Sequence, residues 1–211
     1  MIDSYNKLTL RKWGELAALD RRTFDDDLSR QVAVLAVLAG KSEREILALP
    51  LPDYAALVPS ADFLFDVPKP SGIARGGLRT LRLGAWELVP TTDLRKLSTA
   101  QYVDFQTMLT GGTPIEELLS CFLVPKGHTY CEGYEVGELH ALLADSLTVP
   151  DALALKAFFL RKCESSMRDI LTSCRVAMMA APRKVRKAWR KALTTSPSGG
   201  DGSTPSASSA T

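Results

Sequence analysis

Hydrophobic residues recur every three to four positions along most of this 211-residue chain, which is the spacing of a buried helix face. The first such segment is Leu10–Leu19, where Trp13 and Leu16 fall on one face and Thr9 is placed to cap the helix. The longest opens at Thr148-Val149-Pro150-Asp151 and is expected to continue to Ala181. Its stripe of recurring residues predicts a packing face about thirty residues long: Leu153, Ala157, Leu160, Met167, Leu171, Cys174 and Met178.

Helix-boundary residues divide the first half of the chain into shorter helices. The segment FDDDLSRQVAVLAVLAG follows Thr23, and its aspartates at 25–27 are expected in the first turn, where the helix dipole favours negative charge. Gly40 is placed to end this helix. The pattern Ser42-x-x-Glu45 has the spacing of a capping box and predicts a short helix that stops before Pro50. One more short helix is expected within 53–65.

The second half carries similar signals. The pattern Ser98-x-x-Gln101 is a second capping box, for a helix that ends at Gly111. Thr113-Pro114-x-Glu116 predicts a helix with a cap, a proline at its first position and a carboxylate at its third. A further helix is expected over Glu135–Leu147, after the loop VPKGHTYCEGY.

One segment has β rather than helical character. Residues 67–77, with the sequence VPKPSGIARGG, are expected to form a loop because prolines and glycines dominate them. The residues after this loop predict a two-stranded hairpin at about 78–90, with its turn at Leu83-Gly84-Ala85. An isolated hairpin is barely stable in water, so Trp86 and Leu88 are expected to pack on the helices.

These elements predict a mainly α fold, α+β at most: a single helical domain over 1–182 with one small β-hairpin insert. Pro182 is expected to break the long helix. Residues 183–194 then form a basic helix, and the Ser/Thr/Gly-rich segment 195–211 is expected to be a disordered tail.

Charge is distributed unevenly along the chain. The net charge is +2, yet residues 1–182 carry about −3 while six cations and no acid lie between 183 and 191. These cations, with Trp189 among them, suit phosphates, an anionic bilayer surface or an acidic protein groove, although a solvated helix end has the same composition. The candidate binding residues are Arg183, Lys184, Arg186, Lys187, Trp189, Arg190 and Lys191.

The sequence predicts a cytoplasmic location. The N-terminus has charges throughout and no signal-peptide pattern, and no stretch is apolar enough for a membrane span. The four cysteines are accordingly expected to be reduced thiols rather than a disulfide framework.

Few residues point to catalysis or metal binding. Cys121, His128, Cys131 and His140 lie within twenty residues, but only His128-x-x-Cys131 has the short spacing typical of a zinc knuckle. No nucleophile motif accompanies either histidine, and the loop at 71–77 lacks the lysine of a phosphate-binding loop. We therefore expect no metal, no cofactor and no enzyme activity, with an unfamiliar enzyme using His128 as the least favoured alternative.

The order of elements resembles that of small proteins encoded among the structural genes of tailed bacteriophages. The resemblance rests on LTLRKWGELAALD, the Asp-rich helix start, SEREILALP, the hairpin LRTLRLGAWELVP and LSTAQYVDFQTML, and it spans about 8–181. It implies a non-enzymatic virion-assembly factor in the host cytoplasm, similar to a tail-assembly chaperone, that shields a structural partner protein. It supplies no motif from which functional residues could be transferred. A nucleic-acid-binding accessory protein that acts through the basic helix is the alternative.

Overall fold

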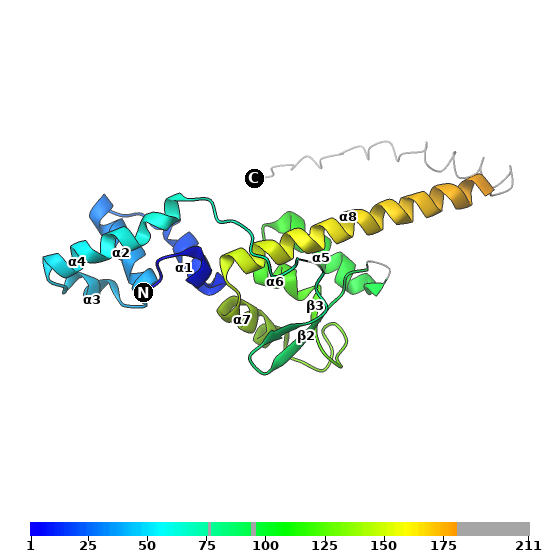
Figure 1. Ribbon diagram of the computed structural model, residues 1–211, viewed down its shortest axis with the longest axis horizontal. Coiled ribbons are helices and arrows are strands. Elements are labelled where there is room, and N and C mark those ends of the chain that lie inside the picture. Colours follow the sequence, from blue (N-terminus) through cyan, green and yellow to red (C-terminus); the bar gives the residue numbers. More distant parts are fainter. Residues whose placement is uncertain (76, 94–95, 181–211) are drawn as a thin grey trace, which may run out of the picture. The chain divides into compact units, whose positions relative to one another are not determined.

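The computed structural model describes residues 1–75, 77–93 and 96–180, and of residue 167 and residues 169–180 it describes the backbone alone (Figure 1). The chain divides into two compact units, Met1–Ser166 and Met167–Thr211. The described part contains eight α-helices and a small antiparallel sheet, which confirms the predicted mainly α fold. The predicted basic helix 183–194, the tail 195–211 and the domain end at 182 lie outside the described residues.

The first unit begins with six helical elements and no strand. A 3₁₀ turn and two helices are followed by two short helices and a longer 3₁₀ segment: η1 (Tyr5–Lys7), α1 (Leu10–Leu19), α2 (Asp27–Ala39), α3 (Glu43–Leu47), α4 (Leu51–Leu57) and η2 (Val58–Phe65). The helix expected within 53–65 is thus α4, which begins earlier and passes directly into the 3₁₀ turns of η2. Pro59, near the start of η2, marks this transition.

Local capping explains why these helices begin and end where they do. The Thr9 hydroxyl accepts a hydrogen bond from the Lys12 backbone N–H, as predicted. Ser42 and Glu45 form the predicted capping box of α3, and Gly40 ends α2 with a φ of 65°. A left-handed residue is the usual end of a helix, and glycine adopts it without steric cost.

The prediction that all three aspartates at 25–27 lie in the first turn of α2 was wrong. Asp26 lies outside the helix in an extended conformation, and its carboxylate accepts the backbone N–H of Ser29 at 2.6 Å. Asp26 is therefore the N-cap of α2, and Asp27 is the one aspartate of the three in the first turn. Aspartate is a strong N-cap residue, and this preference fixes the helix start after Thr23 and Asp25.

The rest of the first unit combines helices with a three-stranded antiparallel sheet. In chain order its elements are β1 (Leu81–Leu83), β2 (Trp86–Pro90), α5 (Thr99–Gly111), α6 (Ile115–Ser120), β3 (Leu123–Pro125), α7 (Val136–Ser146) and the start of α8 (Val149–Ala180). The capping box Ser98–Gln101 and the helices predicted to end at Gly111 and to span 135–147 are confirmed. For α6, Pro114 has an extended ψ of 145° and is the N-cap itself, so it does not occupy the predicted first helical position after Thr113.

The predicted hairpin is present and gains a third strand. β1 pairs antiparallel with β2, with Leu81 opposite Leu88, and β2 pairs antiparallel with β3, with Leu88 opposite Pro125. Leu88 is fully buried and Trp86 packs at the edge of the core, as expected. The three residues of β3, all buried, lie in a stretch that the sequence indicated as helix end and loop.

An aromatic cluster forms the centre of the main core. Phe122 stacks on Phe159 with ring centroids 4.7 Å apart and meets the edge of Phe105 at 4.9 Å. The buried hydrophobic residues of α8 are Val149, Ala152, Ala154, Leu155, Phe158 and Phe159, with Leu153 and Leu160 only partly buried. The packing face therefore differs from the predicted stripe in this part of α8, because the partner helices select which of two apolar stripes is buried. From Met167 on, the predicted stripe lies outside the described side chains.

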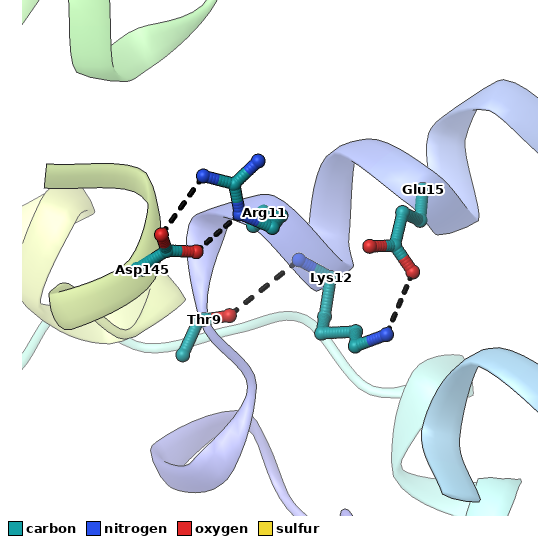
Figure 2. Close-up of polar contacts among 5 residues, drawn as sticks. All are labelled: Thr9, Arg11, Lys12, Glu15 and Asp145. Atoms are coloured by element: carbon teal, nitrogen blue, oxygen red, sulfur yellow. Dashed lines mark hydrogen bonds and ion pairs between the residues drawn. The ribbon is translucent and has the colours of Figure 1, made fainter. Parts of the chain in front are cut away.

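The start of α1 is joined to the end of α7 and the start of α8. Leu10 N–H donates to Leu147 C=O at 3.0 Å and Val149 N–H donates to Leu8 C=O at 2.9 Å, so that Thr9 and Thr148 form an antiparallel bridge. Figure 2 shows the Arg11 guanidinium of α1 facing Asp145 of α7, where both carboxylate oxygens accept hydrogen bonds. That pairing lowers the pKa of Asp145.

Candidate protein-binding groove

The predicted binding residues, Arg183, Lys184, Arg186, Lys187, Trp189, Arg190 and Lys191, lie outside the described residues. Other clusters of side chains that could bind or react lie in the described part of the chain. Three arrangements stand out: the four residues considered for zinc, a serine–histidine pair, and an apolar groove.

The structure does not bring the four zinc candidates together as one site. Cys121 is buried, with its Sγ 3.6 Å from Met108 Sδ and 3.8 Å from the Tyr130 hydroxyl. His128 packs edge-on against Tyr134, and Cys131 is exposed. Among the described residues, no three His, Cys, Asp or Glu side chains are grouped closely enough to hold a metal ion.

Sequence reasoning missed the pair formed by Ser120 and His140. Ser120 Oγ lies 2.9 Å from His140 Nε2, and it donates its proton to the Glu117 carbonyl at 2.7 Å. The serine is 1% exposed. This contact joins the end of α6 to α7, and the tautomer of His140 decides which of the two atoms donates.

The third arrangement is a groove between α1, α2 and η2, called here the α1–α2 groove. It has a volume of about 480 Å³, and its apolar floor comes from Leu16, Val34, Ala61 and Leu64. Two aromatic residues line it at the surface: Trp13 is 38% exposed and Phe65 is 91% exposed. Large apolar side chains left in water beside a concave apolar floor are typical of an interaction site.

Contacts behind the groove fix its third wall, η2. The Tyr5 hydroxyl donates to the backbone carbonyl of Asp66 at 2.9 Å, and its ring meets Phe63 edge-on at 5.0 Å and Trp13 at 6.1 Å. These contacts hold the end of η2 beside α1, with Leu64 turned to the floor and Phe65 to the surface.

A polar hydrogen bond fixes the side of the groove formed by α2. The Tyr54 hydroxyl of α4 donates to the Gln31 side-chain carbonyl at 2.8 Å, and Gln31 lines the groove. The groove is therefore built by packed and hydrogen-bonded elements on three sides, so it exists before any partner binds.

The charged residues that line the groove are mostly aspartates. Asp20, Asp27, Asp62 and Arg30 line the groove, and a more polar hollow of about 380 Å³ continues past Asp20 and Asp27. That hollow adds Asp25, Asp26 and Arg22, so five aspartates stand against two arginines and leave a charge of −3.

Hydrogen bonds and ion pairs engage some of these charged groups. The Ser29 backbone N–H, which donates to Asp26, lowers the pKa of that carboxyl. Arg30 is held by Asp20 at 2.8 Å, and Arg22 pairs with Glu43 of α3. Among the described residues, Asp25, Asp27 and Asp62 form no ion pair and are exposed, so they are available to cations from solution or from a partner.

Within the described residues, no helix combines enough length and enough apolar character to cross a bilayer. Comparison with models of protein families, with curated proteins and with solved structures finds no match to this chain.

Proposed function

We propose that this protein acts without catalysis, as a binding protein that covers an apolar segment of a structural partner during virion assembly. The observation that carries the proposal is the α1–α2 groove, with Trp13 and Phe65 in water above an apolar floor. Exposing a phenylalanine ring has a cost in solvation free energy, which a partner recovers by covering it.

Other features support binding rather than chemistry. The hydroxyl of Ser120 is buried and directed at its own helix. Burial raises the pKa of the Cys121 thiol to about 11, so that this sulfur stays protonated and unreactive at neutral pH. Both groups stabilise the core around α6.

The assembly role itself rests on the resemblance to proteins of tailed-bacteriophage structural modules. A tail-assembly chaperone covers apolar surface on a long structural protein until the particle is built. An open groove suits such transient covering, because a partner can leave it without unfolding either protein.

The test is an affinity capture of the tagged full-length protein from its native host, with mass spectrometry of the eluate. We expect a long structural protein to dominate the eluate of the native sequence and to be lost with Phe65→Asp. The matched control is Leu51→Asp, because Leu51 is also an exposed apolar residue (78%) but lies outside the groove. Equal capture by both variants would refute the groove as the binding site.

The alternative function, nucleic-acid binding, is favoured by six cations without an acid between 183 and 191. It predicts an eluate rich in nucleic acid that is lost as salt increases, since binding to phosphates releases counterions. Such binding would be unaffected by Phe65→Asp, so one experiment separates the two functions.

A further inference from the structure

We infer that the partner segment in the α1–α2 groove is a cationic amphipathic helix, whose apolar face contacts the floor and whose lysines or arginines face the aspartates. The inference rests on the proposed function and specifies the chemistry of its partner. It rests on the charge, the shape and the fixed construction of the groove.

Charge favours a cation over a neutral or acidic occupant. Asp25, Asp27 and Asp62 are exposed and form no ion pair among the described residues, while the two arginines that line the groove and the hollow, Arg30 and Arg22, are paired with Asp20 and Glu43. A negatively charged segment would lie beside unpaired carboxylates of the same sign. Complementary charge therefore selects the partner and its direction in the groove, and speeds its association at low salt.

Shape favours a helix over an extended strand or a small molecule. Two helices and a 3₁₀ segment form the walls, and the groove offers no strand edge to which a peptide could add hydrogen bonds. The contribution of α2 spans Asp27 to Val34, which is about two helical turns or roughly 10 Å. A helical ligand reaches across that distance with anchors at positions i, i+3 or i+4, and i+7.

The exposure of the aromatic side chains that line the groove also argues against a small ligand. Small-molecule sites bury most of the ligand surface. Here Phe65 is almost wholly exposed and Trp13 is more than one-third exposed, so the walls are open to solvent. An elongated occupant covers both rings, whereas a small molecule on the floor would leave Phe65 in water.

The test measures binding of three synthetic helices to the full-length protein. Each peptide has about 18 residues, long enough to be helical alone, with the same leucine and alanine face. They carry lysine, glutamine or glutamate on the polar face. We expect the lysine peptide to bind at least about tenfold more tightly than the glutamine peptide at low salt, with the advantage shrinking as salt screens the charges. The glutamate peptide is expected to bind most weakly.

Charge-neutralised variants locate the interaction. Combining Asp25→Asn, Asp27→Asn and Asp62→Asn is expected to remove the advantage of the lysine peptide and to leave glutamine-peptide binding unchanged. The control makes the same change of charge at exposed residues outside the groove, with Asp53→Asn, Glu132→Gln and Glu138→Gln. It is expected to retain the advantage.

The outcomes separate this inference from the proposed function. Equal binding of the lysine and glutamine peptides would overturn the cationic partner and keep an apolar-binding groove. If none of the three peptides binds to the native protein, the proposed function of the groove is itself refuted. A tenfold gain in lysine-peptide affinity when the six cations at 183–191 are changed to glutamine would identify this chain's own basic segment as the occupant and overturn the assignment to a partner.

Discussion

Phenylalanine occupies opposite environments in this protein. Phe122 is 1% exposed and lies between the rings of Phe105 and Phe159, whereas Phe65 is 91% exposed at the α1–α2 groove. Their contributions to folding differ accordingly, because the apolar surface of Phe122 leaves water on folding and that of Phe65 does not.

Replacing each of these residues by alanine separates stability from binding. We expect Phe122→Ala to lower the free energy of unfolding by about 3–5 kcal/mol, since it leaves a cavity among packed rings. Phe65→Ala is expected to change it by less than about 0.5 kcal/mol. Urea unfolding followed by circular dichroism measures both. A large loss of stability in Phe65→Ala would show that this ring packs in the folded core.

Cys121 is a buried thiol beside the hydroxyl of the partly buried Tyr130. Its pKa is raised to about 11, first by burial, while the Tyr130 hydroxyl 3.8 Å away opposes that shift. Tyr130 in turn donates to Asp104 at 3.0 Å. The group links α5, the end of α6 and the loop before α7 through side chains rather than through the sheet.

Because the pKa of Cys121 is raised, the free energy of unfolding depends on pH in the alkaline range. Between its reference value of 9.0 and about 11, the unfolded thiol loses its proton while the folded thiol keeps it. Unfolding is then favoured, so stability decreases as the pH rises through this range. We expect the urea midpoint of the native protein to fall more steeply from pH 9 to 11 than that of Cys121→Ala. Parallel curves would contradict the assignment.

At the scale of elements, α5 illustrates how one residue joins local and distant structure. Gln101 completes the capping box, where its side-chain oxygen accepts the Ser98 backbone N–H at 2.9 Å. Its amide nitrogen also donates to the Cys121 carbonyl at 3.1 Å. Gln101 is buried, so the start of α5 and the chain after α6 depend on the same side chain.

Alanine substitutions at the two capping-box positions are expected to differ in cost. Ser98→Ala removes one partly buried capping hydrogen bond, which lowers the free energy of unfolding by about 1 kcal/mol. Gln101→Ala also leaves a buried carbonyl without its partner, which adds about 1–3 kcal/mol. Thermal or urea unfolding of both variants gives the comparison. Equal losses would show that water replaces the Gln101 amide at Cys121.

The helices were predictable because their boundary signals are local. Thr9, Gly40, Ser42 and Ser98 act within four residues of their own positions, so the sequence alone indicated where these helices begin or end. The N-cap of α2 was not predictable in the same way, because Thr23 and the three aspartates that follow are all suitable capping residues and the choice of Asp26 depends on three-dimensional context.

Features that depend on distant partners were not predictable. β3 has only three residues, too few to show a periodic pattern, and it exists because β2 pairs with it. The α1–α2 groove joins residues from 13 to 65, and its main signal is exposure of Phe65, which a sequence does not display. The sequence-predicted basic site stays a prediction, because 183–191 lie outside the described residues.

At the scale of the molecule, the first unit contains the whole described core. Among the described residues, the last buried side chain along the chain is that of Phe159, and Leu160 and Cys163 pack at the edge of the same core. Helix α8 continues to Ala180, but the unit ends at Ser166.

Truncation tests this boundary. We expect residues 1–166 to unfold cooperatively, with a thermal midpoint within about 4 °C of the full chain, because the described core lies within them. Ending the chain at Thr148 removes Leu155, Phe158 and Phe159 from the core and is expected to abolish cooperative unfolding. Calorimetry of the two fragments measures this. Failure of 1–166 to fold would place essential contacts beyond Ser166.

The bridge between Thr9 and Thr148 also sets an order of events during synthesis of the chain. At roughly 5–20 residues per second, the ribosome adds Thr148 about 7–28 s after Thr9. The small cluster around Leu35 and Ile46 draws all its residues from 32–61, so it can form early in that interval. Leu8 and Leu10 belong to the main core, which is complete only after the residues of α8 have been synthesised. The nascent protein therefore carries a packed helical segment next to an uncovered start of α1 for most of its translation.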